Sequence, residues 1–280
     1  MVSSSQPLVV LEVDDDDTPK VKFADRIPDW VLLSITFLIL LGLWQLAINI
    51  FNPPPYIIPS PTALGLALWS AATDINLWIN VGVTAEEGGI AFVVATFLAG
   101  ATGLWVTESR LAERIILPYV IAIQAVPKIA IAPLIIIWFG FGISSKVIIA
   151  AMLGFFPIFV NVVTGFKAID QRQLMLMRSL CATRWQIFFK LRLLTACPYF
   201  FAGLQIAAVL CSLGAIVGEF VGAKLGIGSM IIRSQTEMDV ANVFVGVVAL
   251  SLMVSVLHAM VKYVSKKVVF WTEFENQSES

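Results

Sequence analysis

Six long apolar segments constrain the fold of this chain more than any other feature. Each is long enough to cross a hydrocarbon layer about 30 Å thick as a helix. They cover residues 30–51, 84–106, 115–139, 147–166, 199–220 and 242–263. Backbone amides in lipid need internal partners, and the segments do not alternate like barrel strands, so they are predicted to be helices. The expected fold class is an all-α membrane protein with six transmembrane helices.

The composition agrees with a lipid environment and argues against several classes of function. Apolar residues make up 59% and charged residues 13% of the 280 residues, and the mean hydropathy is +0.89. A net charge of −1 without a dominant basic face argues against a nucleic-acid-binding protein. The sequence has no GxxxxGK[ST], HExxH or GxSxG motif, so the chain is expected to be neither an enzyme nor a cofactor carrier. Its three cysteines lack a metal-binding spacing.

The distribution of Lys and Arg sets the expected orientation. With the amino terminus inside, fourteen of these residues fall on the inner side and three on the outer side, while Lys128 lies within a span. Both termini are therefore predicted to be cytoplasmic. The expected organisation is a disordered acidic tail (1–28), a transmembrane domain (29–268) and a second cytoplasmic tail (269–280). On the outer side, Ser60 followed by Pro61 predicts the start of a short helix.

A basic loop at residues 167–198 separates the fourth and fifth spans. A helix at 171–183 would place Leu174, Met177 and either Leu180 or Cys181 on one face. Methionine fills irregular grooves well, so this face can dock a cytoplasmic protein, with flanking arginines against acidic groups. The same helix can instead lie on lipid headgroups, with its arginines on anionic lipid. The residues alone leave both interpretations open.

The third apolar segment is unusual because three prolines interrupt it and a lysine lies inside it. Proline is tolerated in a spanning helix where protein or a water-lined cavity satisfies the freed carbonyls. Lys128 directly follows Pro127, and an intramembrane cation usually faces a cavity or a partner. It either attracts an anionic solute or is a structural lysine that snorkels or caps a freed carbonyl. Glu219, near the end of the fifth span, either lines a gate, faces an outer protein or pairs with Lys146 or Lys224.

Several stretches in the right order carry a resemblance to a known family. Residues 127–142 have the sequence PKIAIAPLIIIWFGFG, Ser145-Lys146 begins the next span, and FFPI follows at 155–158. Later come GEFVG at 218–222 and GIG at 226–228. Over about residues 30–265 the chain resembles permease subunits of binding-protein-dependent ABC importers, nearest to the nitrate, sulfonate and taurine branch. The resemblance implies the type I ABC importer transmembrane fold with a cytoplasmic coupling helix.

The basic loop departs from the family pattern. Aligned on the shared Arg-Trp-Gln at 184–186, the family's EAA element falls on Met175, Leu176 and Met177, and its glycine falls on Cys181. Pro198 matches the second of two late prolines. The amphipathic register remains while the signature residues do not, so both a homodimer and a heterodimer with a different second subunit stay open.

The resemblance implies a function, partners and sites. The chain is expected to form the path of an ATP-driven importer in the bacterial inner membrane, for a small solute such as nitrate, bicarbonate or a sulfonate. A solute-binding protein, two ATPases that hold ATP and Mg²⁺, a second permease subunit and membrane lipid are the implied partners. The implied ATPase-coupling residues are Arg172, Leu174, Met175, Met177, Arg178, Leu180, Cys181, Arg184 and Trp185. The implied pathway or gate residues are Gln124, Lys128, Trp138 and Glu219.

The alternative from another class is an ion-coupled secondary transporter. It predicts buried acids within the spans and internal inverted repeats. Here Asp and Glu are expected at the tails, loops and span ends, with Glu86 and Glu87 at the start of the second span. The sequence therefore favours the importer subunit.

Overall fold

The computed structural model describes residues 29–54 and 56–271, which form helices and loops without a strand. The predicted tail at 1–28 and most of the tail at 269–280 lie outside the described residues. Two compact units are present, one up to Pro53 and one from Pro54 onward. Among the described residues, five helices are long and apolar enough to cross a membrane, or up to six if one bent pair counts as a single span. The all-α membrane fold class is confirmed.

The first unit consists of α1 (Asp29–Phe51). Its apolar side chains point outward within this unit, with Leu33 72% and Phe51 79% exposed. A helix that is apolar all round is stable in lipid rather than in water. It therefore accounts for the first predicted span.

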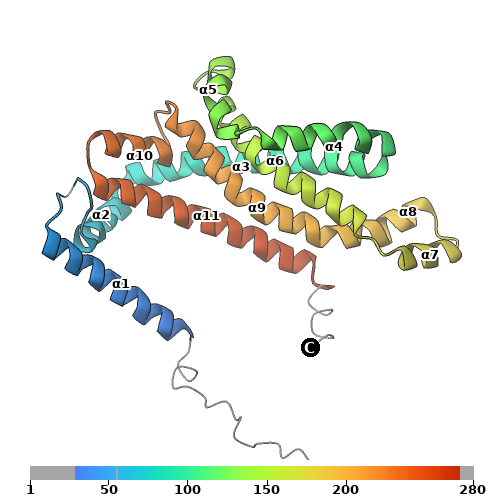
Figure 1. Ribbon diagram of the computed structural model, residues 1–280, viewed down its shortest axis with the longest axis horizontal. Helices are drawn as coiled ribbons and strands as arrows, with labels where there is room; N and C mark the ends of the chain where they lie inside the picture. The colour runs from blue at the N-terminus through green and yellow to red at the C-terminus, as the bar shows by residue number, and fades with distance from the viewer. Residues whose placement is uncertain (1–28, 55, 272–280) are drawn as a thin grey trace, which may run out of the picture. The chain divides into compact units, whose positions relative to one another are not determined.

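Three long helices form the centre of the second unit: α3 (Ile75–Glu108), α6 (Ile143–Lys167) and α9 (Leu193–Phe220) (Figure 1). They pack closely because small residues lie between them. A Cβ atom built on Gly203 of α9 would lie 3.0 Å from the Cα of Ile158, and one on Gly214 would lie 2.5 Å from the Cα of Ala150. Small residues at such crossings let membrane helices approach and gain van der Waals contact.

Three further helices pack on this centre. The long α11 (Val240–Val268) contacts α9, α10 (Ile227–Thr236) and α2 (Pro61–Thr73). The start of α2 is the predicted one, because the hydroxyl of Ser60 accepts from the amide of Ala63 and Pro61 is the first helical residue. In Figure 1, α2 and α10 lie at one end of the bundle and α7 (Gln171–Ser179) and α8 (Arg184–Ile187) at the other, which we call the α7 end.

The third apolar segment is not one straight span. It is divided into α4 (Arg110–Ala125) and α5 (Lys128–Phe139), which are bent by 97° relative to each other. Pro127 lies at the break, and Val126 before it has the extended backbone that a following proline favours. The sequence predicted the proline interruption but not its angle.

Two other spans begin earlier than predicted. α3 starts at Ile75, nine residues before the expected boundary, because Asp74 caps it by accepting from the amide of Asn76. α8, the π-helical turn η2 (Phe188–Arg192) and α9 form one continuous helical stretch, so the fifth span begins inside the basic loop. The expectation that Glu86 and Glu87 begin a helix is wrong, since both lie in the interior of α3.

Candidate functional site

The predicted coupling helix is present as α7, nine residues long. Asp170 caps its start, since its carboxylate accepts from the amide of Arg172 at 2.9 Å. Thr183 and Gln186 then form a capping box that starts α8: the Gln186 amide donates to the Thr183 hydroxyl, and the Thr183 amide donates to the Gln186 side chain. Local capping by polar side chains therefore fixes both short helices.

Cys181 ends α7 in the left-handed region, with φ 54°. Its amide donates to the carbonyl of Arg178, and the amide of Ala182 donates to the carbonyl of Met177, both at 3.0 Å. This is the Schellman arrangement, in which glycine is usual because it has no Cβ. The position where the family pattern has glycine is thus a backbone requirement of the helix end, and Cys181 meets it at a conformational cost of about 1–2 kcal/mol.

Aromatic rings support the turn between α7 and α9. Trp185 stacks on Phe189 with ring centroids 5.9 Å apart, and Phe188 stacks on Phe166 at 6.1 Å. Phe188 and Phe189 also meet edge to face at 5.1 Å. Such pairs add specific contact beyond their buried area. The rings therefore connect α8 and η2 to the end of α6.

The predicted coupling residues divide into two groups by exposure. Leu174 and Met177 are half-buried. The other members of the set are exposed: Arg172, Met175, Arg178, Leu180, Cys181, Arg184 and Trp185. Leu176, which was not in the predicted set, is 60% exposed, beside Leu180 at 69% and Trp185 at 73%. The apolar surface that faces outward is therefore formed by Met175, Leu176, Leu180 and Trp185, which we call the α7–α8 face.

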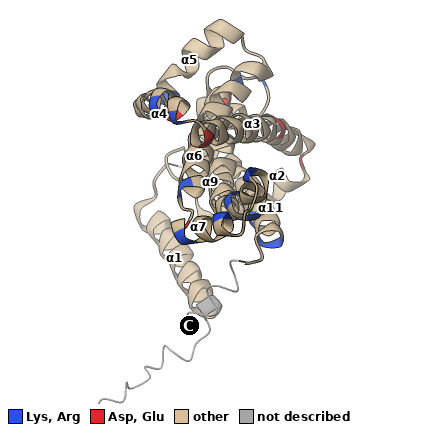
Figure 2. Cartoon of the chain, turned by 90° about the vertical axis from the view of Figure 1, so that its right-hand side faces the viewer, with Lys and Arg blue, Asp and Glu red and all other residues tan. Residues whose placement is uncertain are grey.

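Basic residues border the α7–α8 face. Arg172, Arg178 and Arg184 form no ion pair with another described residue. Figure 2 views the molecule from this end and shows Lys and Arg on α7 and at the start of α4. An exposed apolar patch with a charged rim is typical of an interaction site.

Two ion pairs at the α7 end connect different helices, and sequence reasoning did not find them. Lys167, the last residue of α6, donates to Glu113 of α4 at 2.5 Å. Arg192 of η2 pairs with Glu108 at the end of α3. The sequence feature that could have indicated these ion pairs is the presence of opposite charges at the ends of successive spans. These pairs link both ends of the α7–α8 segment to α3 and α4.

Lys128, the predicted pathway cation, lies at the start of α5 beside the break. Its ammonium donates to the carbonyl of Gln124 at 3.0 Å and lies 4.3 Å from the ring centroid of Phe156. The first contact satisfies a carbonyl at the end of α4, and the second is a cation–π contact. Gln124 and Trp138 are exposed, Trp138 by 69%. The structure therefore brings Gln124 and Lys128 together, while Trp138 lies near the other end of α5.

Glu219, the last predicted pathway residue, is 1% exposed. Its carboxylate accepts from the Thr84 hydroxyl at 2.7 Å and from the Gly228 amide at 2.5 Å. Thr84 in turn accepts from the amide of Ile227 at 2.8 Å. A Cβ at Gly226 or Gly228 would collide with the Glu219 carboxylate. Glu219 thus binds the start of α10 to α3 and α9, and its carboxylate forms no ion pair with another described residue.

A buried ion pair joins α3 to α6. Lys146 donates to Glu87 at 2.5 Å, and the two residues are 8% and 2% exposed. Sequence reasoning placed Glu87 at the start of a span and expected acids only at the tails, loops and span ends, whereas Glu87 lies buried in the interior of α3. The available signal was Lys146 at the start of an apolar run, because a buried cation needs a partner.

Comparison with known proteins agrees with this architecture. Residues 91–270 match the family described as the binding-protein-dependent transport system inner membrane component. The chain is 31% identical to the riboflavin transport system permease protein of Chloroflexus aurantiacus, over 91% of this chain and 95% of that protein. It is 30% identical to the formylaminopyrimidine transport permease protein of Halalkalibacterium halodurans, over 85% and 94%. It is 27% identical to the putative aliphatic sulfonates transport permease protein of Escherichia coli, over 84% and 88%.

Proposed function

The chain belongs to the family of inner membrane components of binding-protein-dependent transport systems. We propose that an ATPase binds its α7–α8 face and that the movement of the ATPase during ATP hydrolysis is transmitted to the chain there. It is a multi-pass inner-membrane permease subunit of an ABC importer, and separate subunits hydrolyse ATP. Membership in this family implies an ATPase and a solute-binding protein as partners. ATP and Mg²⁺ are then held by the ATPase, and this chain carries no cofactor.

One observation supports the coupling role most directly: the exposed apolar patch at the α7–α8 face. Leu176, Leu180 and Trp185 are each at least 60% exposed, and the neighbouring arginines form no ion pair with another described residue. A groove on an ATPase with an acidic border fits this chemistry. A lipid surface would also accept the arginines, but the family assigns an ATPase to the cytoplasmic side.

The ion pairs at the α7 end supply a route for movement. When the ATPases close on ATP and displace α7, Lys167 carries the motion to Glu113 at the start of α4. Arg192 carries it to Glu108 of α3. A small rigid-body shift of these helices then changes the side of the membrane from which solute can enter the path beside α4 and α5. In this proposal both termini lie on the cytoplasmic side of the membrane.

A second permease subunit completes the path in this proposal. α4 and α5 present a broad apolar surface within the second unit, including Ile121, Leu134 and Ile137, at 60%, 47% and 75% exposure. An identical copy or a different permease can cover it, and lipid surrounds the remaining apolar surface. The solute is proposed to be an anion, such as nitrate, bicarbonate or a sulfonate, that is attracted by Lys128 on its passage. Glu219, being buried, would act only as a structural support of the gate region.

The test is co-purification of the partner ATPase with variants of the α7–α8 face. Leu176→Asp and Trp185→Asp should each abolish co-purification, because an acid replaces an apolar contact residue. Gln171→Asp places the same acid at the start of α7, away from the apolar patch, and should retain the ATPase. If the first two variants still bind the ATPase and support transport, the coupling face is elsewhere.

A further inference from the structure

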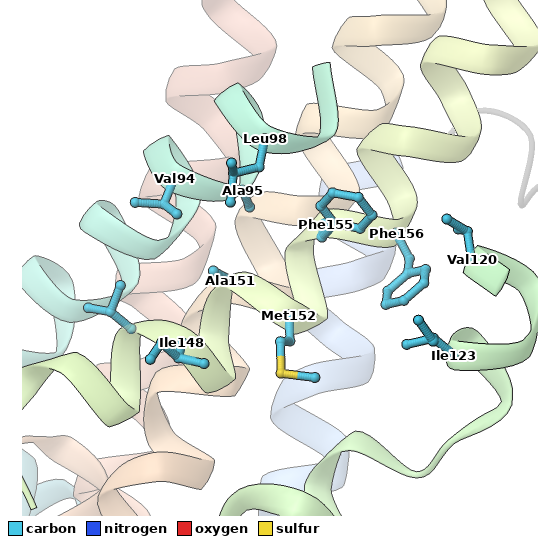
Figure 3. A pocket seen from close by; sticks show the side chains of 11 residues that line it. Val94, Ala95, Leu98, Val120, Ile123, Ile148, Ala151, Met152, Phe155 and Phe156 are labelled. Carbon is cyan, nitrogen blue, oxygen red and sulfur yellow. The ribbon is translucent and has the colours of Figure 1, made fainter. Parts of the chain in front are cut away.

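An apolar cavity of about 380 Å³ lies between α3, α4 and α6, next to the break between α4 and α5. Figure 3 shows Leu98 from α3, Val120 and Ile123 from α4, and Phe155 and Phe156 from α6 around it. Every described side chain that lines the cavity is apolar. Its volume is that of a small-molecule site, which is typically about 300–1,000 Å³.

One cation lies at the edge of this cavity. The ammonium of Lys128 is 4.3 Å from the ring centroid of Phe156, which lines the cavity. Among the described residues it donates one hydrogen bond, to the carbonyl of Gln124, so an ammonium with three donors retains capacity for an anionic group. The site thus combines a dry apolar wall with a single positive charge at its edge.

This combination discriminates between kinds of anion. A small inorganic oxyanion such as nitrate gains nothing from the apolar wall and would lose most of its hydration, because the wall offers no hydrogen-bond donor. An organic anion with a ring body can bury the ring between α3, α4 and α6 while its charged group remains at Lys128. Phe155 and Phe156 supply aromatic surface for such a ring.

We propose that this cavity is a subsite for the apolar ring of an organic anion, with Lys128 holding the anionic group at its edge. The proposal rests on the proposed function and narrows its anionic solute to an organic anion with a ring, in place of a small inorganic anion such as nitrate or bicarbonate. Two of the relatives described above are named for ring compounds, riboflavin and formylaminopyrimidine, which is consistent with this solute class.

The experiment measures equilibrium binding of radiolabelled 2-naphthoate to the full chain, co-expressed with its ATPase and reconstituted in nanodiscs. Binding to empty nanodiscs is subtracted. The expected result is saturable binding that unlabelled 2-naphthoate displaces and an equal concentration of nitrate does not. Lys128→Met should weaken binding at least about tenfold, the fold-change that corresponds to about 1.4 kcal/mol.

Matched variants test the position of the ring. Ile123→Trp fills the cavity and should abolish binding, whereas Ile115→Trp on the same helix does not line the cavity and should bind normally. Val94→Trp from α3 fills the cavity from the other side and repeats the test if Ile123→Trp fails to fold. Equal binding by the variants at 115 and 123, displacement by nitrate, or absence of saturable binding would each overturn the proposal. Failure of the coupling role would appear separately, as retention of the ATPase by Leu176→Asp and Trp185→Asp in the co-purification experiment.

Discussion

The hydroxyl of Thr84 provides a sharp test of how the α10 end of the bundle is held together. Thr84 is fully buried in α3 and lies between Glu219 of α9 and the first amides of α10. Thr84→Val keeps the shape of the side chain and removes only the hydroxyl. It leaves the carboxylate oxygen of Glu219 without this donor and the amide of Ile227 without its acceptor.

The size of the effect follows from these two hydrogen bonds. The bond to Glu219 and the bond from Ile227 each contribute about 0.5–1.5 kcal/mol, and the buried Ile227 amide left without an acceptor adds a cost of about 1 kcal/mol. Their joint loss should lower the free energy of unfolding by about 2–4 kcal/mol. At about 2–4 °C per kcal/mol, the melting temperature should fall by roughly 4 °C or more.

The assay is thermal unfolding of the purified protein in detergent, followed with a thiol-reactive dye that reports exposure of the buried Cys211. Thr96→Val is the matched control, because its hydroxyl is buried in the same helix and has no hydrogen-bond partner among the described residues. It should leave the melting temperature unchanged or raise it. Equal shifts for the two variants would refute the argument that Glu219 and Thr84 hold the start of α10.

Three further predictions concern other contacts. Lys146→Met should lower the free energy of unfolding by about 3–5 kcal/mol in the same assay, because it leaves Glu87 buried without its partner; adding Glu87→Leu should recover most of the loss, and no recovery would contradict the pairing. Cys181→Gly should stabilise the end of α7 by about 1 kcal/mol, seen as slower hydrogen exchange of the α7 amides, and unchanged exchange would argue against backbone strain there. Glu113→Lys should impair ATP-driven uptake because it breaks the pair with Lys167. The protein level should stay normal, since an exposed pair contributes only about 0–1 kcal/mol to stability. Adding Lys167→Glu should restore uptake, and an equally impaired double variant would show that the pair is not part of the coupling route.

Much of the architecture could be predicted from the sequence because lipid limits the choices. A backbone in lipid must satisfy its amides internally, so apolar length alone predicts helices. Local capping is equally visible: Ser60 and Pro61 start α2 where the sequence predicts it, and the helix in the basic loop is present as α7. These features depend on neighbours in the chain, which a single sequence displays.

Features that depend on distant residues were not predictable in the same way. Pro127 predicts an interruption of the segment, but it does not predict the 97° angle between α4 and α5. Glu87 and Lys146 are 59 residues apart, and neither segment contains a sequence pattern that identifies the other residue as its partner. The helical register grouped Leu174 with Met177, but it could not tell which side of α7 faces the rest of the chain. The exposed face therefore shifts toward Leu176 and Trp185.

The central claim is that this permease moves solute only when a separate ATPase drives the α7–α8 face. The direct test reconstitutes the chain in liposomes with and without its partner ATPase and solute-binding protein, and follows uptake of the solute which that binding protein retains. Uphill uptake that requires ATP and the ATPase is the predicted result. Uphill uptake by the chain alone, driven by a proton or sodium gradient, would contradict the account.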